Sequence, residues 1–425
     1  MADLNRGYRR DDNELADDDG YISPVVSDLL DIATDAFLKD REQRRGRVGE
    51  PSWHRSLTLM LRVRCLDLWT SVAVRDALIA LLEWLTGDDW HLTFDGTRPD
   101  NVHHDGQIRL PLDDHVDDVV LFSGGLDATA GIAHLLASGR YVMAIGVVTN
   151  TAMIGYQRKV VRALRRDGAG RVDYRPISLA SLRTTDQDES TRRTRGLVFL
   201  AAGVAAAVAA GHDRLLMLEN GIGAINLPYT AAQWGAMTSR AAHPRTLVLM
   251  GELLKLVLER PVEVANPHIG QTKGQMVQAL PEWAGDSCAS SESCDNAAAG
   301  RGRLERRCGE CTSCLLRRVS FAAADRSHWD LRPYRADVHG PRPNRDRSVE
   351  MLWQVAALDR ALRDPDPGEL SRWFPALRHV PVDILDPPAQ RRLLATYVEE
   401  WRRYPDPRVS SFLDSEPLEE VGRSD

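Results

Sequence analysis

A strand-like run that ends in two adjacent glycines has the residue types needed to bind an anion. Residues 118–129 read DVVLFSGGLDAT. Adjacent glycines let backbone N–H groups approach a phosphate, a serine adds a hydroxyl, and the helix that follows points its positive end at the same place. The run has neither the lysine of a GxxxxGK loop nor the spacing of GxGxxG, and a plain chain reversal is the alternative. We expect a phosphate-binding loop made of Ser123, Gly124, Gly125, Leu126 and Asp127.

Five of the six cysteines lie close together in the sequence, with the spacing of a metal site. Cys308, Cys311 and Cys314 form the pattern CGECTSC, and either Cys294 or Cys288 can complete a set of four thiolates. Four thiolates without a nearby histidine favour a structural Zn²⁺ ion. An iron–sulfur cluster and unliganded buried cysteines are the alternatives.

Three further segments carry side chains suited to an active site. Arg195 belongs to an arginine-rich run before an apolar helix, where an anionic ligand or a solvated loop would account for the charges. Glu219 and Asn220 follow a predicted strand, where open sheets bind ligands, and a capped turn is the alternative. Lys273 stands at a predicted helix start, where the dipole disfavours a cation. We expect Arg195 and Lys273 to meet phosphate or carboxylate, and Glu219 and Asn220 to recognise a purine-like edge.

The glycine loop resembles the signature of the PP-loop ATP pyrophosphatases, which is Ser-Gly-Gly-x-Asp-Ser directly after the first strand. Members of this superfamily split ATP into AMP and pyrophosphate, usually to adenylate a carbonyl or carboxylate oxygen. Here Ala128 takes the place of the last serine. The change removes one phosphate hydrogen bond, worth about 1.5–3 kcal/mol when charge-assisted, and Thr129 is the candidate substitute.

Combined with the later run CGECTSCLLRR, the loop resembles the QueC family of 7-cyano-7-deazaguanine synthases over roughly residues 118–325. Family members carry a fourth cysteine about twenty residues after a lysine motif, which favours Cys294 over Cys288. The resemblance implies catalytic roles for Asp127, Arg195 and Lys273, with ATP, Mg²⁺ and Zn²⁺ as cofactors. It implies that ATP adenylates 7-carboxy-7-deazaguanine and that ammonia then gives an amide, which is dehydrated to a nitrile.

The chain adds about 115 residues before that core and about 95 after it. This long form resembles the QueC-like proteins of bacterial anti-phage systems, including QatC and the type IV CBASS homologue, which share a Leu-Thr-Gly-Asp-x-Trp-like turn (residues 85–90). For those proteins the implied acceptor is a protein amine. We therefore expect an amide-forming ligase that joins a deazaguanine to a partner protein of the same defence operon. Nitrile synthesis for queuosine, tRNA sulfuration and a non-catalytic nucleotide-binding scaffold stay open.

The elements that must position these residues follow an α/β pattern. From residue 116 apolar runs alternate with helical segments, which predicts a doubly wound parallel sheet. We expect an N-terminal α+β extension (1–115, its first 20 or so residues mobile), a PP-loop core with the cysteine site (116–328) and a C-terminal helical region (329–425). Core strands are expected at 119–122, 141–148, 172–177, 215–218 and 262–265, and helices near 128–138, 154–166, 196–211 and 247–259. Outside the core, we expect helices at 21–45, 72–85, 349–362 and 390–402 and strands at 57–63 and 90–94.

Composition limits the partners. The 54 basic and 61 acidic side chains give a formal charge of −7, which argues against a protein that coats nucleic acid. The start of the chain is polar, and the longest apolar run, at 197–210, is shorter than the roughly 20 residues that span a bilayer. We expect a cytoplasmic protein without a membrane partner, and crowded cysteines in a reducing compartment agree with metal binding.

Overall fold

The computed structural model describes residues 22–46, 50–98, 116–148, 151–168, 170–178, 189, 191, 193–228, 239–295, 306–309, 311–335, 345–366, 368–405, 409 and 413. Its contacts divide the chain into two compact units. The first unit comprises Met1–Ser123, Leu135–Leu218 and Ser239–Pro267, and the second comprises Gly124–His134, Glu219–Thr238 and His268–Asp425. Because the chain passes between the units several times, neither unit is a single continuous stretch.

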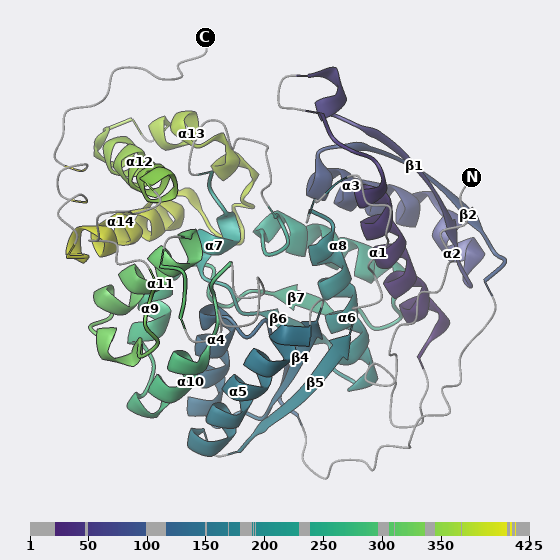
Figure 1. Cartoon of the computed structure of the whole chain (residues 1–425). Coiled ribbons are helices and arrows are strands. Elements are labelled where there is room, and N and C mark those ends of the chain that lie inside the picture. Colours follow the sequence, from purple (N-terminus) through teal and green to yellow (C-terminus); the bar gives the residue numbers. More distant parts are fainter. Residues whose placement is uncertain are drawn as a thin grey trace. The chain divides into compact units, whose positions relative to one another are not determined.

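A five-stranded parallel sheet forms the centre of the first unit, in the order β5-β4-β3-β6-β7 (Figure 1). From β3 the chain adds β4 and then β5 on one side, and it then adds β6 and β7 on the other side of β3. Since parallel crossovers are right-handed in nearly all proteins, this reversal moves the connecting helices from one face of the sheet to the other. The strands are β3 (Asp118–Leu121), β4 (Val142–Val148), β5 (Val172–Ser178), β6 (Arg214–Met217) and β7 (Glu263–Ala265).

The predicted α/β class with a parallel sheet is confirmed, and the predicted strands lie within one or two residues of the observed ones. The apolar runs of β3 and β4 are nearly continuous because both faces of these two strands are largely buried, as in a parallel sheet covered by helices. The connecting helices are α4 (Leu126–Ala137), α5 (Thr151–Asp167), α6 (Arg195–Ala209) and α8 (Pro244–Val257).

The N-terminal residues of the first unit form a helix and a small parallel βαβ unit. β1 (Ser56–Arg62) pairs in parallel with β2 (Asp89–Asp95), and α2 (Leu66–Thr70) and α3 (Val72–Thr86) connect them. Alternate residues of β1 are buried, as expected for a strand with one covered face. Gly87 ends α3 in the left-handed conformation at φ +69°.

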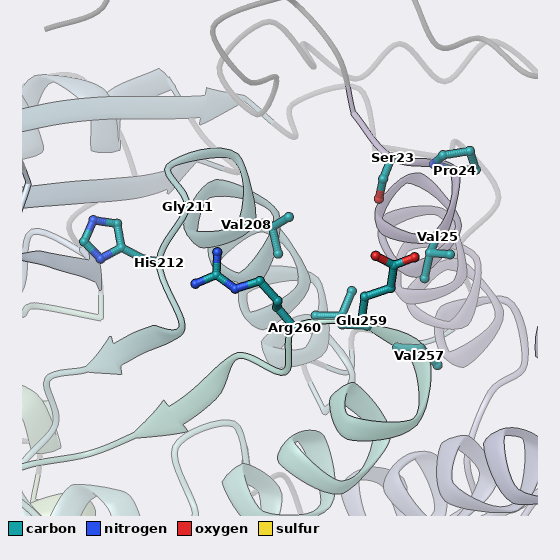
Figure 2. Close-up of a pocket in the computed structure, with 10 residues that line it drawn as sticks. Ser23, Pro24, Val25, Val208, Gly211, His212, Val257, Glu259 and Arg260 are labelled. Atoms are coloured by element: carbon teal, nitrogen blue, oxygen red, sulfur yellow. The ribbon is translucent and has the colours of Figure 1, made fainter.

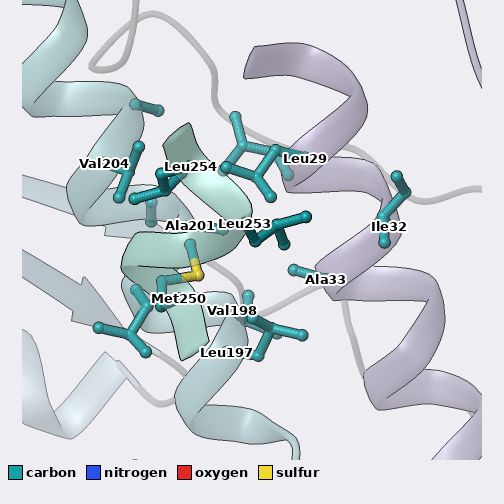
Figure 3. Packing of buried hydrophobic residues seen from close by; sticks show 14 of the residues in the cluster. Leu29, Ile32, Ala33, Leu197, Val198, Ala201, Val204, Met250, Leu253 and Leu254 are labelled. Carbon is teal, nitrogen blue, oxygen red and sulfur yellow. The ribbon is translucent and has the colours of Figure 1, made fainter. Parts of the chain in front are cut away.

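Helices α1 (Pro24–Glu42), α6 and α8 pack together in one hydrophobic core that also includes the small sheet. Their ends surround a hollow of about 460 Å³, where the aliphatic side chains of Val25, Val208 and Val257 lie near Arg260 (Figure 2). Their middle turns interdigitate, with Leu29 and Ala33 of α1 facing side chains of α6 and α8 (Figure 3). The N-terminal helix is therefore part of the same core as the sheet helices.

The second unit is helical in its described residues. A second core, with Met351, Leu394 and Trp401 among its buried side chains, joins the C-terminal helices to α11. The predicted helical C-terminal region is thus confirmed. The helices of this unit are the start of α4, α7 (Gly221–Ile225), α9 (Lys273–Gln278), α10 (Gly285–Ser290), α11 (Thr312–Ala323), α12 (Arg345–Arg363), α13 (Glu369–Trp373) and α14 (Pro387–Arg403).

In the described part of the chain, no helix combines the length and the apolar character needed to cross a membrane.

Candidate active site and cysteine cluster

The glycine loop follows β3 directly and leads into α4. Gly124 has a φ of +81°, which lies in the left-handed region that glycine adopts without steric cost. Asp127 lies in the first turn of α4. Ser123 is exposed and belongs to the first unit, whereas Gly124, Gly125, Leu126 and Asp127 belong to the second. The sequence therefore forms the expected strand, glycine turn and helix.

Four predicted site residues from three parts of the sequence meet in the second unit. The Lys273 ammonium donates to Oδ2 of Asp127 at 2.5 Å, and the two side chains are only 15% and 11% exposed. The Asn220 amide donates to the same Oδ2 at 3.3 Å and to Oε1 of Glu219 at 2.9 Å. The structure thus brings Asp127, Glu219, Asn220 and Lys273 into one polar cluster.

The Glu219 carboxyl group is the unusual member of this cluster. Burial among protein atoms raises its pKa well above the ordinary value, and the negative charge of Asp127 raises it further, against the opposing effect of Lys273. The physical reason is that two neighbouring carboxylates in a poorly solvated site cannot both ionise cheaply. The Glu219 carboxyl group therefore keeps its proton to a higher pH than an ordinary glutamic acid does, and in that form it can donate a hydrogen bond.

Oδ1 of Asp127 is the remaining acceptor of the cluster. It is buried and accepts no hydrogen bond from an N–H group of the described residues, while the adjoining Glu219 carboxyl group hydrogen-bonds the Asp127 side chain. A buried carboxylate oxygen is costly unless a donor or a cation satisfies it. A cation or a donor from a bound molecule would satisfy it.

Lys273 is the first residue of α9, and local hydrogen bonds explain how a lysine is held there. Thr272 caps the helix by accepting from the Gln275 N–H at 3.1 Å, while Oε1 of Gln275 accepts from the Thr272 N–H at 2.9 Å. The Thr272 hydroxyl also donates to Oε1 of Glu400, which comes from α14. A helix of the C-terminal region therefore supports the segment that presents Lys273.

The hydroxyl of Thr129, the candidate substitute for a serine at position 128, has a partner within the protein. Thr129 is fully buried, and its hydroxyl donates to the Gly125 carbonyl at 2.7 Å within the helix. Ala128 is also buried. The Leu126 N–H donates to the hydroxyl of Ser293 at 3.2 Å. The hydroxyl that accepts from the first residue of α4 thus comes from a distant segment.

Arg195 lies at the first position of α6 in the first unit, with its guanidinium over the Phe199 ring at 5.5 Å. The arginine before it has a structural role. Arg193 donates to the Thr86 carbonyl at the end of α3, where helix carbonyls lack partners and a cation is favourable. Burial lowers the pKa of Arg193 to about 10, and the nearby Arg45 adds to that shift. The arginine-rich run is therefore explained in part by packing against α3.

The four cysteines favoured by the sequence lie together in the second unit. Each sulfur of Cys294, Cys308, Cys311 and Cys314 lies within 4.8 Å of the others, close enough to hold one metal ion. The Cys311 N–H donates to the sulfur of Cys308 at 3.4 Å, an arrangement that stabilises a thiolate ligand. A zinc ion fits this set, because four sulfurs without a water position form a closed structural site.

Cys288 does not join that group. It is fully buried in α10, and burial raises the pKa of its thiol to about 12, so the thiol stays protonated. Its carbonyl accepts from Arg317 at 2.7 Å, and Arg317 also donates to the hydroxyl of Ser291 at 2.7 Å. A buried arginine of α11 thus fixes the stretch that leads from Cys288 to Cys294.

The site also contains residues that the sequence did not single out. The glycine loop accepts a hydrogen bond from Glu292 and donates one to Ser293, and the cap of α9 donates one to Glu400. These three residues come from segments without a recognisable motif. Only Ser293 carried a signal, since it directly precedes a predicted metal ligand.

Comparison with known proteins adds no relative. No family model matches the sequence, and no curated protein is detectably similar to it.

Proposed function

We propose that this chain is an ATP-dependent ligase that adenylates the carboxylate of 7-carboxy-7-deazaguanine and joins it to an amine of a partner protein in an anti-phage defence system. The carboxylate oxygen attacks the α-phosphorus of ATP, and pyrophosphate leaves. The amine then attacks the carbonyl carbon, AMP leaves with the bonding electrons of the C–O bond, and the amine loses a proton. The products are an amide, AMP and pyrophosphate.

The cluster of Asp127, Glu219, Asn220 and Lys273 beside the glycine loop is the observation that carries this proposal. Lys273 is a cation held next to a turn whose backbone can approach phosphates. Its present partner is an aspartate, which a phosphate can replace because the ammonium is a point charge on a flexible stem. Charge neutralisation of leaving pyrophosphate is the main demand of adenylation, and no nucleophilic side chain is needed.

The buried Oδ1 of Asp127 fits the Mg²⁺ that the resemblance implies, because Mg²⁺ prefers oxygen ligands and shares them between carboxylates and phosphates. When bound, Mg²⁺ supplies further charge neutralisation to the phosphates. Asp127 would hold it, while Lys273 offers its charge to the leaving group. Glu219, whose pKa is raised by burial and by Asp127, would in its protonated form donate to a ligand acceptor without adding negative charge near the phosphates.

The Asn220 amide and the Glu219 carboxyl group suit recognition of a deazaguanine. Asn220 is held in place because its Oδ1 accepts from the Gly223 N–H at 3.0 Å, so it also caps α7. Its two amide hydrogens face carboxyl oxygens of Asp127 and Glu219. A fixed pattern of donors and acceptors is what a purine-like edge requires.

The extra segments favour a protein acceptor over ammonia. The C-terminal helices build most of the second core, and α14 supports the helix that begins at Lys273. The N-terminal helix shares its core with the sheet helices. These segments are folded parts of the protein, larger than ammonia delivery requires, and they offer surfaces for a partner chain.

The experiment is to incubate the protein with ATP, 7-carboxy-7-deazaguanine and the proteins encoded beside it, and to measure intact protein masses together with AMP. The proposal expects AMP release and a mass increase on one partner that corresponds to acylation with loss of water. AMP release with a nitrile product, and no partner required, would instead show queuosine-type nitrile synthesis. Absence of AMP under all these conditions would overturn the enzymatic assignment.

A further inference from the structure

Helix α14 contacts both of the segments that bring donors to Asp127. Its Leu393 lies against Gly221, the first residue of α7, where an added Cβ would come within 2.6 Å of the leucine side chain. Its Glu400 lies against Gly274, the second residue of α9, where an added Cβ would clash with Oε1. Leu393 and Glu400 stand about two turns apart on one side of α14. Because both contacted residues are glycines, one helix approaches the two segments closely.

The contact at Gly221 restrains the Asn220 amide. Asn220 directly precedes Gly221, caps α7 with its side chain and donates to Oδ2 of Asp127 at 3.3 Å. Gly221 is also held from the other direction, because its N–H donates to the Gln271 carbonyl at 2.7 Å and a Cβ on it would clash with the Ile269 carbonyl oxygen. The start of α7 is therefore enclosed between α14 and the segment that precedes α9.

The contact at Gly274 restrains the Lys273 ammonium. The Glu400 carboxylate also accepts a hydrogen bond from the Thr272 hydroxyl, so it touches the residue on each side of Lys273. Lys273 in turn donates to Oδ2 of Asp127, the oxygen that also accepts from the cap of α7. Both donors to this oxygen therefore stand next to a residue that α14 contacts.

We propose that Leu393 and Glu400 are positioning residues of the candidate site. Through them α14 holds the Asn220 amide and the Lys273 ammonium against Oδ2 of Asp127. The inference deepens the proposed function and rests on it where activity is concerned, because this cluster is the site proposed for ATP and the deazaguanine. Since α14 belongs to the C-terminal region, that region contributes to the geometry of the site as well as to a core of its own.

The first test measures how fast formaldehyde and cyanoborohydride methylate Lys273 in the absence of ATP, with peptide masses as the readout. The Lys273 side chain is only 15% exposed, so the reaction is slow in the unaltered protein. Glu400→Ala should raise its rate at least about fivefold relative to the exposed Lys255, because the start of α9 loses a contact. Glu399→Ala, at an exposed neighbour on α14, should leave the rate within about twofold.

The second test measures hydrogen exchange in a peptide that covers residues 219–226, again without ATP. Leu393→Ala is compared with Leu394→Ala, because both leucines are buried in the same core of the second unit. Of the two, only Leu393 is among the closest contacts of Gly221. Leu393→Ala should therefore speed exchange of this peptide at least about fivefold more than Leu394→Ala does. Leu393→Met, which nearly keeps the side-chain volume, should restore slow exchange.

Activity links these local effects to the reaction. With ATP and 7-carboxy-7-deazaguanine, Leu393→Ala and Glu400→Ala should release pyrophosphate at least about tenfold more slowly than their matched controls, at a temperature where all the variants are folded. General destabilisation would affect both leucine variants alike.

Equal exchange in the two leucine variants would overturn the inference, as would unchanged methylation of Lys273 in Glu400→Ala. Pyrophosphate release at the rate of the controls would also overturn it. If both local effects appear but the unaltered protein forms no AMP, the proposed function fails and the positioning of the two donors stands.

Discussion

Lys273 and Asp127, 146 residues apart in the sequence, meet through a hydrogen bond of 2.5 Å between Nζ and Oδ2. Both side chains are largely withdrawn from water, so the pair is screened less than a surface ion pair. The lysine follows the last strand of the sheet, and the aspartate follows the first. The contact therefore joins two segments that follow the first and the last strand of the sheet.

Replacing Lys273 should remove ATP activation. Lys273→Ala is expected to lower the rate of pyrophosphate release by about 100-fold or more, because it removes the cation that stabilises the leaving group. Lys255→Ala is the matched control, since Lys255 is an exposed lysine of α8. The measurement is a steady-state pyrophosphate assay on both variants.

A melting curve distinguishes this effect from loss of the fold. Removing one partner of a buried pair costs about 3–5 kcal/mol, so Lys273→Ala should also melt at a lower temperature. Lys273→Met, whose apolar side chain fills similar space, separates loss of activity from loss of the fold. It should be equally inactive at a temperature where it is folded. A folded Lys273→Met that releases pyrophosphate at the unaltered rate would contradict the role of Lys273.

Glu219 should make stability depend on pH in a known direction. Because the pKa of its carboxyl group in the folded protein lies well above the ordinary value, the folded state holds one proton more than the unfolded state in the interval between them. The free energy of unfolding therefore falls as the pH rises through that interval, by up to about 1.4 kcal/mol per pH unit. Glu219→Gln carries no ionisable group, so thermal melts from pH 5 to 9 should show a shallower loss of stability. An unchanged pH dependence would contradict a raised pKa of Glu219.

Glu400 allows a second pH test, at the helix that presents Lys273. Burial raises the pKa of Glu400 to about 7, against the lowering effects of Thr272 and Arg403. The sign is the same as for Glu219, so the contribution to stability is complete below about pH 4.5 and is lost as the pH rises to about 7. Glu400→Gln keeps an oxygen that can accept from the Thr272 hydroxyl, and its melting temperature should exceed that of the unaltered protein more at pH 8 than at pH 5.

Glu400→Ala should behave differently. It removes the acceptor of the Thr272 hydroxyl and leaves space beside Gly274, whose Cα faces the carboxylate so closely that a Cβ there would lie 2.3 Å from Oε1. The cap of α9 then loses its support, and Lys273 is held less firmly. We expect weaker ATP binding in Glu400→Ala than in Glu400→Gln at pH 7, measured by titration calorimetry. Equal affinities would show that α14 does not position Lys273.

The sequence predicted the sheet and the loop because their signals are local. Apolar runs such as Val119–Phe122 and the adjacent glycines are short patterns that need no distant partner, and the cysteine spacing reports one metal site directly. The support of the site could not be predicted in this way. Ser293 and Glu400 reach Leu126 and Thr272 only through the packing of α10, α11 and α14, and that packing depends on contacts between residues more than a hundred positions apart.

The same limit applies to single side chains. The Thr129 hydroxyl donates to the carbonyl four residues earlier, a bond that a threonine in a helix can form and that its type alone does not reveal. In the arginine-rich run that contains Arg195, Arg193 donates to the end of α3, a contact that no linear pattern reveals.

Removal of the metal should test whether the cysteine cluster supports the glycine loop. The protein should contain about one zinc per chain, and Cys311→Ala should lose it, because Cys311, the residue before α11, belongs to the group of four sulfurs. Cys65→Ala and Cys288→Ala are the matched controls and should retain zinc, since neither sulfur belongs to that group. Iron in place of zinc, with visible absorbance, would instead indicate an iron–sulfur cluster.

Chelation should then lower both stability and ATP affinity. Structural zinc contributes on the order of 10 kcal/mol in small domains, so a melting temperature at least about 10 °C lower is expected. Without zinc, Cys294 is no longer fixed, and the bonds from Glu292 to Gly124 and from Leu126 to Ser293 lose their anchor. ATP should therefore bind at least about tenfold more weakly at a temperature where the zinc-free protein is still folded, and binding should recover when zinc is restored. Full ATP affinity in a folded, zinc-free protein would show that the cluster and the loop act independently.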